Sequence, residues 1–356
     1  MRDLYTKIRQ LSAECESIRH RAAALAGYRC AHDAYKILYF LLYDHCRRHE
    51  AHIIDFDLAQ ARPTDNVSTD VHFRFATLAT GTPHETGEMW LAFRATGKFS
   101  TIESLGARHE LGCLLGYEIN ALHGESTRRL PHSHDGAELN CLSFGLQPRT
   151  EVTLTTMNTV LQTNYLVSEG EILHLAKTIA TAVIQLDSTP WFTTFWNSDN
   201  IVLFLDDPKD SFPLKKPHFR IRLEHASRQS SEHQSPSTEV MLFCLAIVLY
   251  ELWKYFPGDK NMYEPRLDRF DDGNVTLIRR NIKRQMDKWV QTRSIPETYA
   301  EIIDWCLDAP SCTAEEMRNS SKKLNEIFER VICGLEKVES ECGDSAALIK
   351  GWKISD

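Results

Sequence analysis

Hydrophobic positions change their spacing several times along this 356-residue chain. Near the N-terminus, apolar side chains recur every three or four residues over 2–25 and 31–48, which predicts two helices. Apolar residues then alternate or run over short lengths at 53–58, 71–75 and 89–93, with glycine and proline between them, and this pattern predicts strands. The first half of the chain is therefore expected to be helical at its start and β-rich afterwards.

Beyond Ser168 the pattern becomes mostly helical. The helical spacing over 173–186 stops before Pro190, because the residue that precedes a proline disfavours helical backbone. The run over 240–256 is apolar on all sides and predicts a buried helix. In contrast, the stretch 275–290 is amphipathic and basic, which predicts a helix with one solvent-exposed face.

Two capping boxes of the type S/T-x-x-E, at 294–297 and 313–316, predict that helices begin near 295 and 314. We expect an α+β fold with two lobes, a mainly helical C-terminal lobe and a boundary near residue 165. The expected parts are N-terminal helices over 1–50, a small β-rich lobe over 51–165, a helical domain over 166–340 and a tail over 341–356.

The composition, 42% hydrophobic and 25% charged residues, is ordinary for a globular protein. A net charge of -8 argues against a surface that coats nucleic acid unspecifically, although it leaves room for a local basic groove. The ten cysteines include no CxxC pair and the N-terminus has no signal-peptide pattern, so we expect a cytoplasmic protein with free thiols. The longest apolar run is about half the length that a membrane span needs.

Three segments of the C-terminal half resemble the C-lobe of protein kinases. They are CLAIVLYELW at 244–253, IIDWCLDAP at 302–310 and IATAVIQLDSTPWF at 179–192, which is similar to the helix before the kinase catalytic loop. The order of LYDHCRRHEAHI, LNCLSF and LAKTIATAVIQLDSTPWF also resembles a fungal family of uncharacterised proteins with a kinase-like C-terminal domain. The resemblance implies a degenerate, protein-kinase-like fold.

The residues of kinase chemistry are missing from the matching positions. If Asn200 takes the place of the magnesium-binding asparagine, the position of the catalytic base falls on Phe195, and no DFG triplet follows Asp207. Phosphoryl transfer needs metal ligands, a base and a lysine together. We therefore expect no active kinase, no cofactor and no bound metal.

The segment Asp206-Asp207-Pro208-Lys209-Asp210 is a DDxxD string. It is similar to the DDxxE motif of fungal arginine-containing cyclodipeptide synthases, with a last acid one methylene shorter. The resemblance implies a tRNA-dependent synthase that forms an arginine-containing diketopiperazine from aminoacyl-tRNAs by acyl transfer and ring-closing aminolysis.

In that interpretation Asp206, Asp207 and Asp210 are catalytic. A carboxylate binds a guanidinium in a bidentate fork, and a carboxylate with a raised pKa can take a proton from the attacking amine. The alternative is that the segment is a solvated turn, because aspartate and proline favour turns.

Further candidates would contact the substrate or the tRNA. Trp191, Trp196 and Asn200 are expected to bind the substrate, with core packing as the alternative for the two tryptophans. Basic residues that could contact the tRNA, or form only a solvated face, are Lys215, Lys216, Arg279, Arg280, Lys283 and Arg284.

The expected partners are arginyl-tRNA and a second aminoacyl-tRNA, without DNA or membrane. The other function that the resemblance allows is a non-catalytic, pseudokinase-like interaction module in fungal signalling or cell death.

Overall fold

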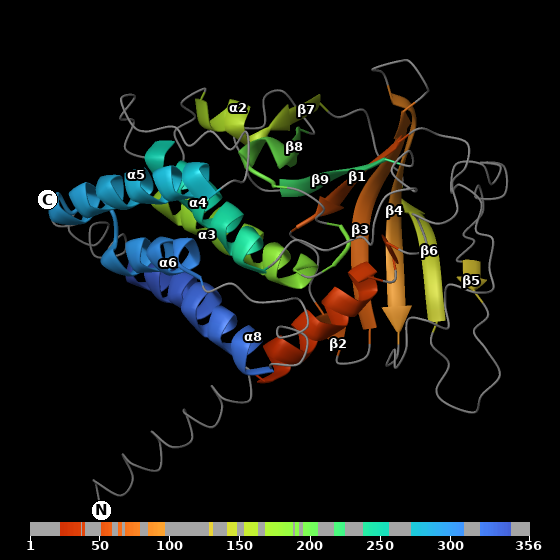
Figure 1. The fold of residues 1–356 in the computed structure, drawn as a ribbon. Helices are drawn as coiled ribbons and strands as arrows, with labels where there is room; N and C mark the ends of the chain where they lie inside the picture. Colours follow the sequence, from red (N-terminus) through yellow and green to blue (C-terminus); the bar gives the residue numbers. More distant parts are fainter. Residues whose placement is uncertain are drawn as a thin grey trace, which may run out of the picture.

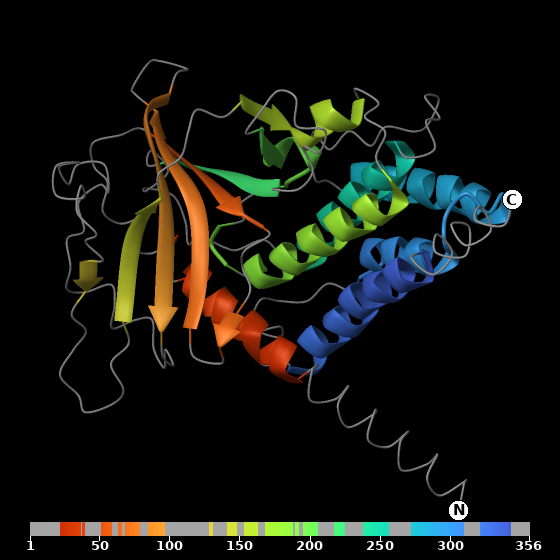
Figure 2. The ribbon, with the colours of Figure 1, turned by 180° about the vertical axis from the view of Figure 1, so that it is seen from behind.

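An antiparallel sheet on one side and a group of helices on the other make up the described part of the computed structural model (Figures 1 and 2). The structure describes residues 22–36, 38–39, 51–58, 63–65, 68–78, 85–96, 128–130, 141–147, 153–162, 168–187, 189–191, 195–205, 217–224, 238–255, 272–309 and 321–342.

The strands pair in the order β5-β6-β4-β3-β1-β9-β8-β7, with β2 paired to β3. Their bounds are β1 Ala51–Asp57, β2 Pro63–Asp65, β3 Ser68–Leu78, β4 Glu85–Thr96, β5 Arg128–Leu130, β6 Cys141–Gln147, β7 Thr153–Thr156, β8 Ile201–Leu205 and β9 Pro217–Glu224. The strands predicted at 53–58, 71–75 and 89–93 lie in β1, β3 and β4. Because β1 pairs with both β3 and β9, the sheet is continuous across the expected boundary near residue 165.

The first described helix covers residues 22–36, and the other helical elements follow from Met157 onward. They are α2 Met157–Gln162, α3 Glu169–Leu186, the 3₁₀ turn η3 Ser198–Asn200, α4 Thr238–Tyr255, α5 Asp272–Gln291, α6 Glu297–Leu307, α8 Ser321–Ile327 and the π-helical segment η6 Phe328–Cys333. The three helices predicted at 173–186, 240–256 and 275–290 correspond to α3, α4 and α5. All residues from 241 to 250 are buried, as the apolar pattern predicts.

Two local predictions are wrong. The chain was expected to leave the helix between residues 25 and 31, but it is helical without a break over 22–36, because the helix packs on both the sheet and η6. The Tyr28 ring, for example, contacts Phe328 edge to face at 5.4 Å. The N-terminus of α6 has Pro296 as its N-cap without a side-chain capping bond, so the predicted box at Ser294 does not form.

A capping box that was not predicted opens α3. The Ser168 hydroxyl accepts a hydrogen bond from the Glu171 backbone N–H at 3.3 Å, and the Glu171 carboxylate accepts one from the Ser168 N–H at 2.8 Å. The same S-x-x-E rule would have found it. The box therefore fixes the N-terminus of α3 five residues before the apolar spacing becomes regular.

The main core lies between the sheet and the helices. Phe56 on β1 is opposite Phe73 on β3 and Phe219 on β9, so one row of the sheet presents three rings to the core. Tyr35, from the helix over 22–36, contacts the Phe56 ring edge to face at 5.1 Å. Side chains alternate across a strand, so the neighbouring positions of these strands face the other way. Of the helices that the structure describes, none has the length and the apolar character needed to cross a membrane.

Candidate functional site

The predicted catalytic acids follow β8 directly. Asp206, Asp207 and Asp210, together with the predicted tRNA-binding pair Lys215 and Lys216, lie outside the described residues. Their roles stay predictions.

The loop before β8 is held by its own amide groups. The Asn200 side-chain oxygen accepts a hydrogen bond from the Asn197 backbone N–H at 3.0 Å, and the Asn197 oxygen accepts one from Asp199 N–H at 2.9 Å. The Asn158 amide of α2 donates to the Asp199 carboxylate at 2.9 Å. Phe195, which the kinase resemblance would place at the position of the catalytic base, packs against the main core. The Asn200 side-chain oxygen thus takes part in the capping box of the turn η3.

The two tryptophans predicted to bind substrate are core residues, which corrects that interpretation. Trp191 is 1% exposed, and its indole N–H donates to the Tyr35 carbonyl at 2.6 Å. Its ring contacts Tyr39 and Phe56 edge to face, at 5.0 and 4.8 Å. An indole surrounded by aromatic side chains in this way contributes packing energy and has no free face for a ligand.

Trp196 is 2% exposed and packs edge to face on Phe219 at 5.2 Å. Its backbone also hydrogen-bonds the Cys244 thiol of α4, whose pKa burial raises to about 12. Trp196 therefore joins the loop to both the sheet and α4, in the packing role that was the alternative prediction.

A buried row of charges crosses the centre of the sheet. Asp55 on β1 is opposite Arg74 on β3 and Arg220 on β9. The carboxylate of Asp55 is 0% exposed; it accepts from Arg74 Nη1 at 2.9 Å and, in a bidentate fork, from Arg220 Nε and Nη2 at 2.7 and 2.9 Å. Sequence reasoning missed this row, and its signal was a charged residue inside the apolar run IIDFD.

Two of the predicted tRNA-binding residues on α5 are paired with the C-terminal end of α6, and their role toward tRNA stays a prediction. Arg279 Nε donates to the Leu307 carbonyl at 2.9 Å and lies 3.5 Å from the Asp308 carboxylate. Lys283 Nζ contacts Asp304 at 2.8 Å and Asp308 at 2.5 Å. Partial burial by itself lowers the pKa of Lys283, but the bonds to the two aspartates outweigh it and the pKa is raised. These two cations therefore stabilise the packing of α5 on α6.

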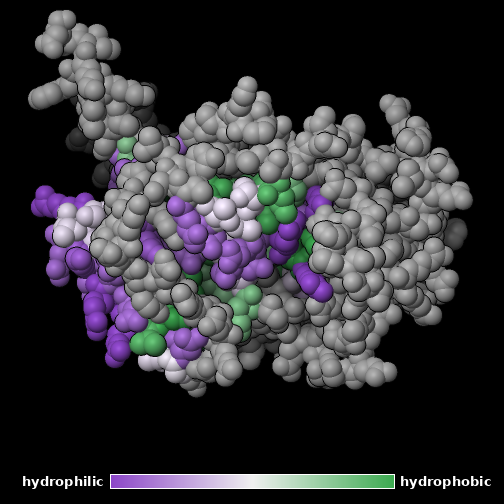
Figure 3. Space-filling model, turned by 90° about the horizontal axis from the view of Figure 1, so that it is seen from above, coloured by the Kyte–Doolittle hydropathy of each residue, from purple (hydrophilic) through white to green (hydrophobic). Residues whose placement is uncertain are grey.

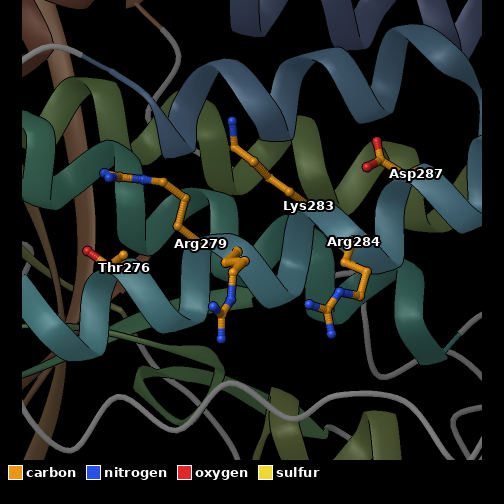
Figure 4. Close-up of a pocket in the computed structure, with 6 residues that line it drawn as sticks. Thr276, Arg279, Lys283, Arg284 and Asp287 are labelled. Carbon is orange, nitrogen blue, oxygen red and sulfur yellow. The ribbon is translucent and has the colours of Figure 1, made fainter.

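The other two predicted residues, Arg280 and Arg284, are exposed one helical turn apart. Within the part of the chain that the structure describes, no carboxylate pairs with either guanidinium. In Figure 4 the Arg284 side chain points away from the side to which Arg279 and Lys283 extend. A shallow hollow of about 480 Å³ follows the helix here, lined by Thr276, Arg279, Arg280, Lys283, Arg284 and Asp287.

Hydrophilic side chains cover the end of the molecule where α5 lies. They lie at the left side of the view from above (Figure 3), which is the end of the molecule where Figure 1 labels α5. A hollow lined by four basic residues and one acid can bind anions, and its chemistry is that of a binding surface. The fold and the site thus define an α+β protein with a continuous antiparallel sheet and a basic helix face.

Residues 147–342, more than half of the chain, match the model of the family described as Domain of unknown function (DUF7580). The chain belongs to that family. No curated protein matches the sequence.

Two similar solved structures contain a fungal pseudokinase. The structure of the Neurospora crassa PAN3 pseudokinase is 8% identical, with a TM-score of 0.27, and the match covers 80% of this chain and 63% of that one. The complex of Neurospora crassa PAN2 with PAN3 is also 8% identical, with a TM-score of 0.28 and coverage of 80% and 61%. The chain thus spans less than two thirds of the length of these proteins, and TM-scores this low do not define a shared fold.

Proposed function

We propose that this protein is a non-catalytic, pseudokinase-like interaction module. The observation that carries the proposal is the loop before β8, where the residues aligned with a kinase base and a kinase metal ligand have other tasks. Phe195 is partly buried and packs against the core, and the Asn200 side-chain oxygen caps a 3₁₀ turn at 3.0 Å. Phosphoryl transfer requires a base and metal ligands at these two positions.

The test is a phosphotransfer assay with labelled ATP and magnesium, run beside a thermal unfolding measurement with the same nucleotide. A ligand at 100 times its Kd stabilises the folded state by about 2.7 kcal/mol, so a nucleotide site would raise the melting temperature measurably. The proposal predicts no transfer to protein substrates and no such rise. Transfer of labelled phosphate that is lost on heat inactivation would overturn it.

A second candidate is the tRNA-dependent synthase of an arginine-containing cyclic dipeptide. The exposed pair Arg280 and Arg284 favours it, because aminoacyl-tRNA binding needs a cationic surface. The activated ester of an aminoacyl-tRNA makes ATP unnecessary, so the candidate is compatible with a loop that lacks kinase groups.

Mass spectrometry of cells that express the protein, compared with cells that express Asp207→Asn, decides this second candidate. A cyclic arginine-containing dipeptide in the first culture and its absence from the second would support the synthase. If neither culture contains the compound, although both variants are folded and abundant, the synthase is refuted and the non-catalytic module stands.

A further inference from the structure

We propose that the exposed face of α5 binds single-stranded RNA. This surface, named the α5 face below, consists of the exposed residues Thr276, Leu277, Arg280, Arg284, Asp287 and Lys288. They are spaced by one, three, four and seven positions, so they project from one side of the helix. The inference supplies a partner for the interaction module proposed above.

The basic side chains of α5 form ion pairs on the side that packs on α6, whereas those of the exposed side have no acidic partner among the described residues. Lys283 has two carboxylates within 2.8 Å, both from the end of α6. Arg280 and Arg284, in contrast, have no acidic partner among the described residues and are like charges at i and i+4. Such a pair destabilises a helix by about 0.2–0.5 kcal/mol unless an anion lies between the two groups. In a chain of net charge -8, this local excess of positive charge points to an anionic ligand.

The cations follow the helix axis. Arg280, Arg284 and Lys288 are successive steps of four residues, so they extend over about 12 Å at about 1.5 Å per residue. A single phosphate would contact only one or two of them, whereas a chain of phosphates can contact all three. The spacing therefore favours a linear polyanion over a small anionic metabolite.

The other members of the α5 face favour unpaired bases. Leu277 is 45% exposed, one of two large hydrophobic side chains exposed among the described residues, and it lies one turn before Arg280. Asp287 is exposed beside the arginines and would repel a surface made only of phosphates, but it can accept from the amino group of an adenine or cytosine. Bases become available for such contacts when the strand is single, and arginine also stacks on them.

The Thr276 hydroxyl lines the same hollow and is a neutral donor and acceptor. A ribose 2′-hydroxyl needs a partner of this kind, and it is the group that distinguishes RNA from DNA at a given site. The α5 face thus combines cations for the backbone, an apolar group and a carboxylate for bases, and a hydroxyl for the ribose.

The experiment is fluorescence anisotropy of the full chain with a short labelled RNA of adenosine and cytidine, titrated at several salt concentrations. The test variant is Arg280→Glu/Arg284→Glu, with Arg280→Gln/Arg284→Gln as a second variant that introduces no repulsion. The matched control is Arg330→Glu/Lys337→Glu, which makes the same change in net charge at two exposed residues of the C-terminal helical segment.

We expect the wild-type affinity to fall with salt with a log–log slope of about -0.7 for each phosphate contacted. Both α5 variants should weaken binding at least about tenfold and make the slope shallower by about 1.4, since two contacts are lost. The control should retain most of the affinity. Leu277→Ala should weaken binding without changing the slope, because an apolar contact releases no counterion.

Equal losses in the α5 variants and the control would overturn the proposal, since they would show a response to net charge alone. Equal affinity for DNA of the same sequence, or no binding at low salt, would also overturn it. These results leave the kinase assay untouched, so a failure of the RNA inference is distinct from a failure of the proposed function.

Discussion

Removal of the Asp55 carboxylate tests the buried charge row directly. In Asp55→Ala, the Arg74 guanidinium, whose residue is 5% exposed, loses the carboxylate that accepts its hydrogen bond at 2.9 Å. Arg220 also loses a bidentate partner, but its side chain is 24% exposed and can rehydrate in part. The variant therefore removes the Asp55 carboxylate from one buried and one half-buried cation in the middle of the sheet.

The expected cost follows from these environments. Breaking a buried ion pair by removal of one partner costs about 3–5 kcal/mol. Two unit charges about 4 Å apart interact by about 4 kcal/mol at an effective dielectric constant near 20. Because Arg220 can rehydrate, we expect about 3 kcal/mol for Asp55→Ala.

Urea unfolding followed by tryptophan fluorescence measures this cost, because Trp191 and Trp196 are buried in the native state. The matched control is Lys177→Met, which breaks a half-exposed ion pair with Glu339 and should cost less than about 1 kcal/mol. The replacement of all three members of the row by apolar residues of similar size should cost less than Asp55→Ala alone. If Asp55→Ala costs no more than Lys177→Met, the row does not stabilise the sheet and the reasoning is refuted.

The remaining predictions concern side chains of the helical part. Gly170→Ala should stabilise the protein by up to about 1 kcal/mol, because nothing lies within 4 Å of the added Cβ. Gly334→Ala should gain less or lose stability, because its Cβ would lie 2.9 Å from a buried isoleucine methyl of α6. Thermal melts of the two variants measure the difference. Burial and the hydrogen bond to Glu169 raise the pKa of Cys342 to about 12, so Glu169→Gln should lower this pKa and speed alkylation of Cys342 at pH 8, read by peptide mass spectrometry; an unchanged rate would contradict this assignment. Burial also raises the pKa of Tyr28 to about 12, above the ordinary value near 10. Its stabilising contribution is therefore complete below pH 10 and is lost as the pH rises toward 12, and Tyr28→Phe should reduce the loss of unfolding free energy over that range.

The spacing of hydrophobic residues was sufficient to predict several helices and strands. The all-apolar run at 240–256 predicts a buried helix, and α4 over Thr238–Tyr255 is buried throughout its central ten residues. The amphipathic period at 275–290 predicts α5, and the alternation at 71–75 predicts part of β3. These elements could be predicted because burial on one face or on all faces leaves a periodic trace in neighbouring residues.

The partners of polar and aromatic side chains could not be predicted in the same way. Nothing near Arg279 in the sequence distinguishes it from Arg280, yet one donates to the end of α6 and the other is exposed. Trp191 looks equally suited to a cleft or a core, and the contacts with Tyr39 and Phe56 decide for the core. Each outcome depends on which distant element packs beside the residue.

The amino-acid pattern alone therefore predicted α3, α4 and α5, parts of three strands, the α+β type of the protein and the basic character of the helix over 275–290. The tertiary structure decided that β9 joins β1 in a continuous sheet, that Asp55 lies between Arg74 and Arg220, and that α5 keeps two arginines exposed. The physical reason is distance along the chain: Asp55 and Arg220 are 165 positions apart, and only the strand pairing brings their charges to 2.7 Å.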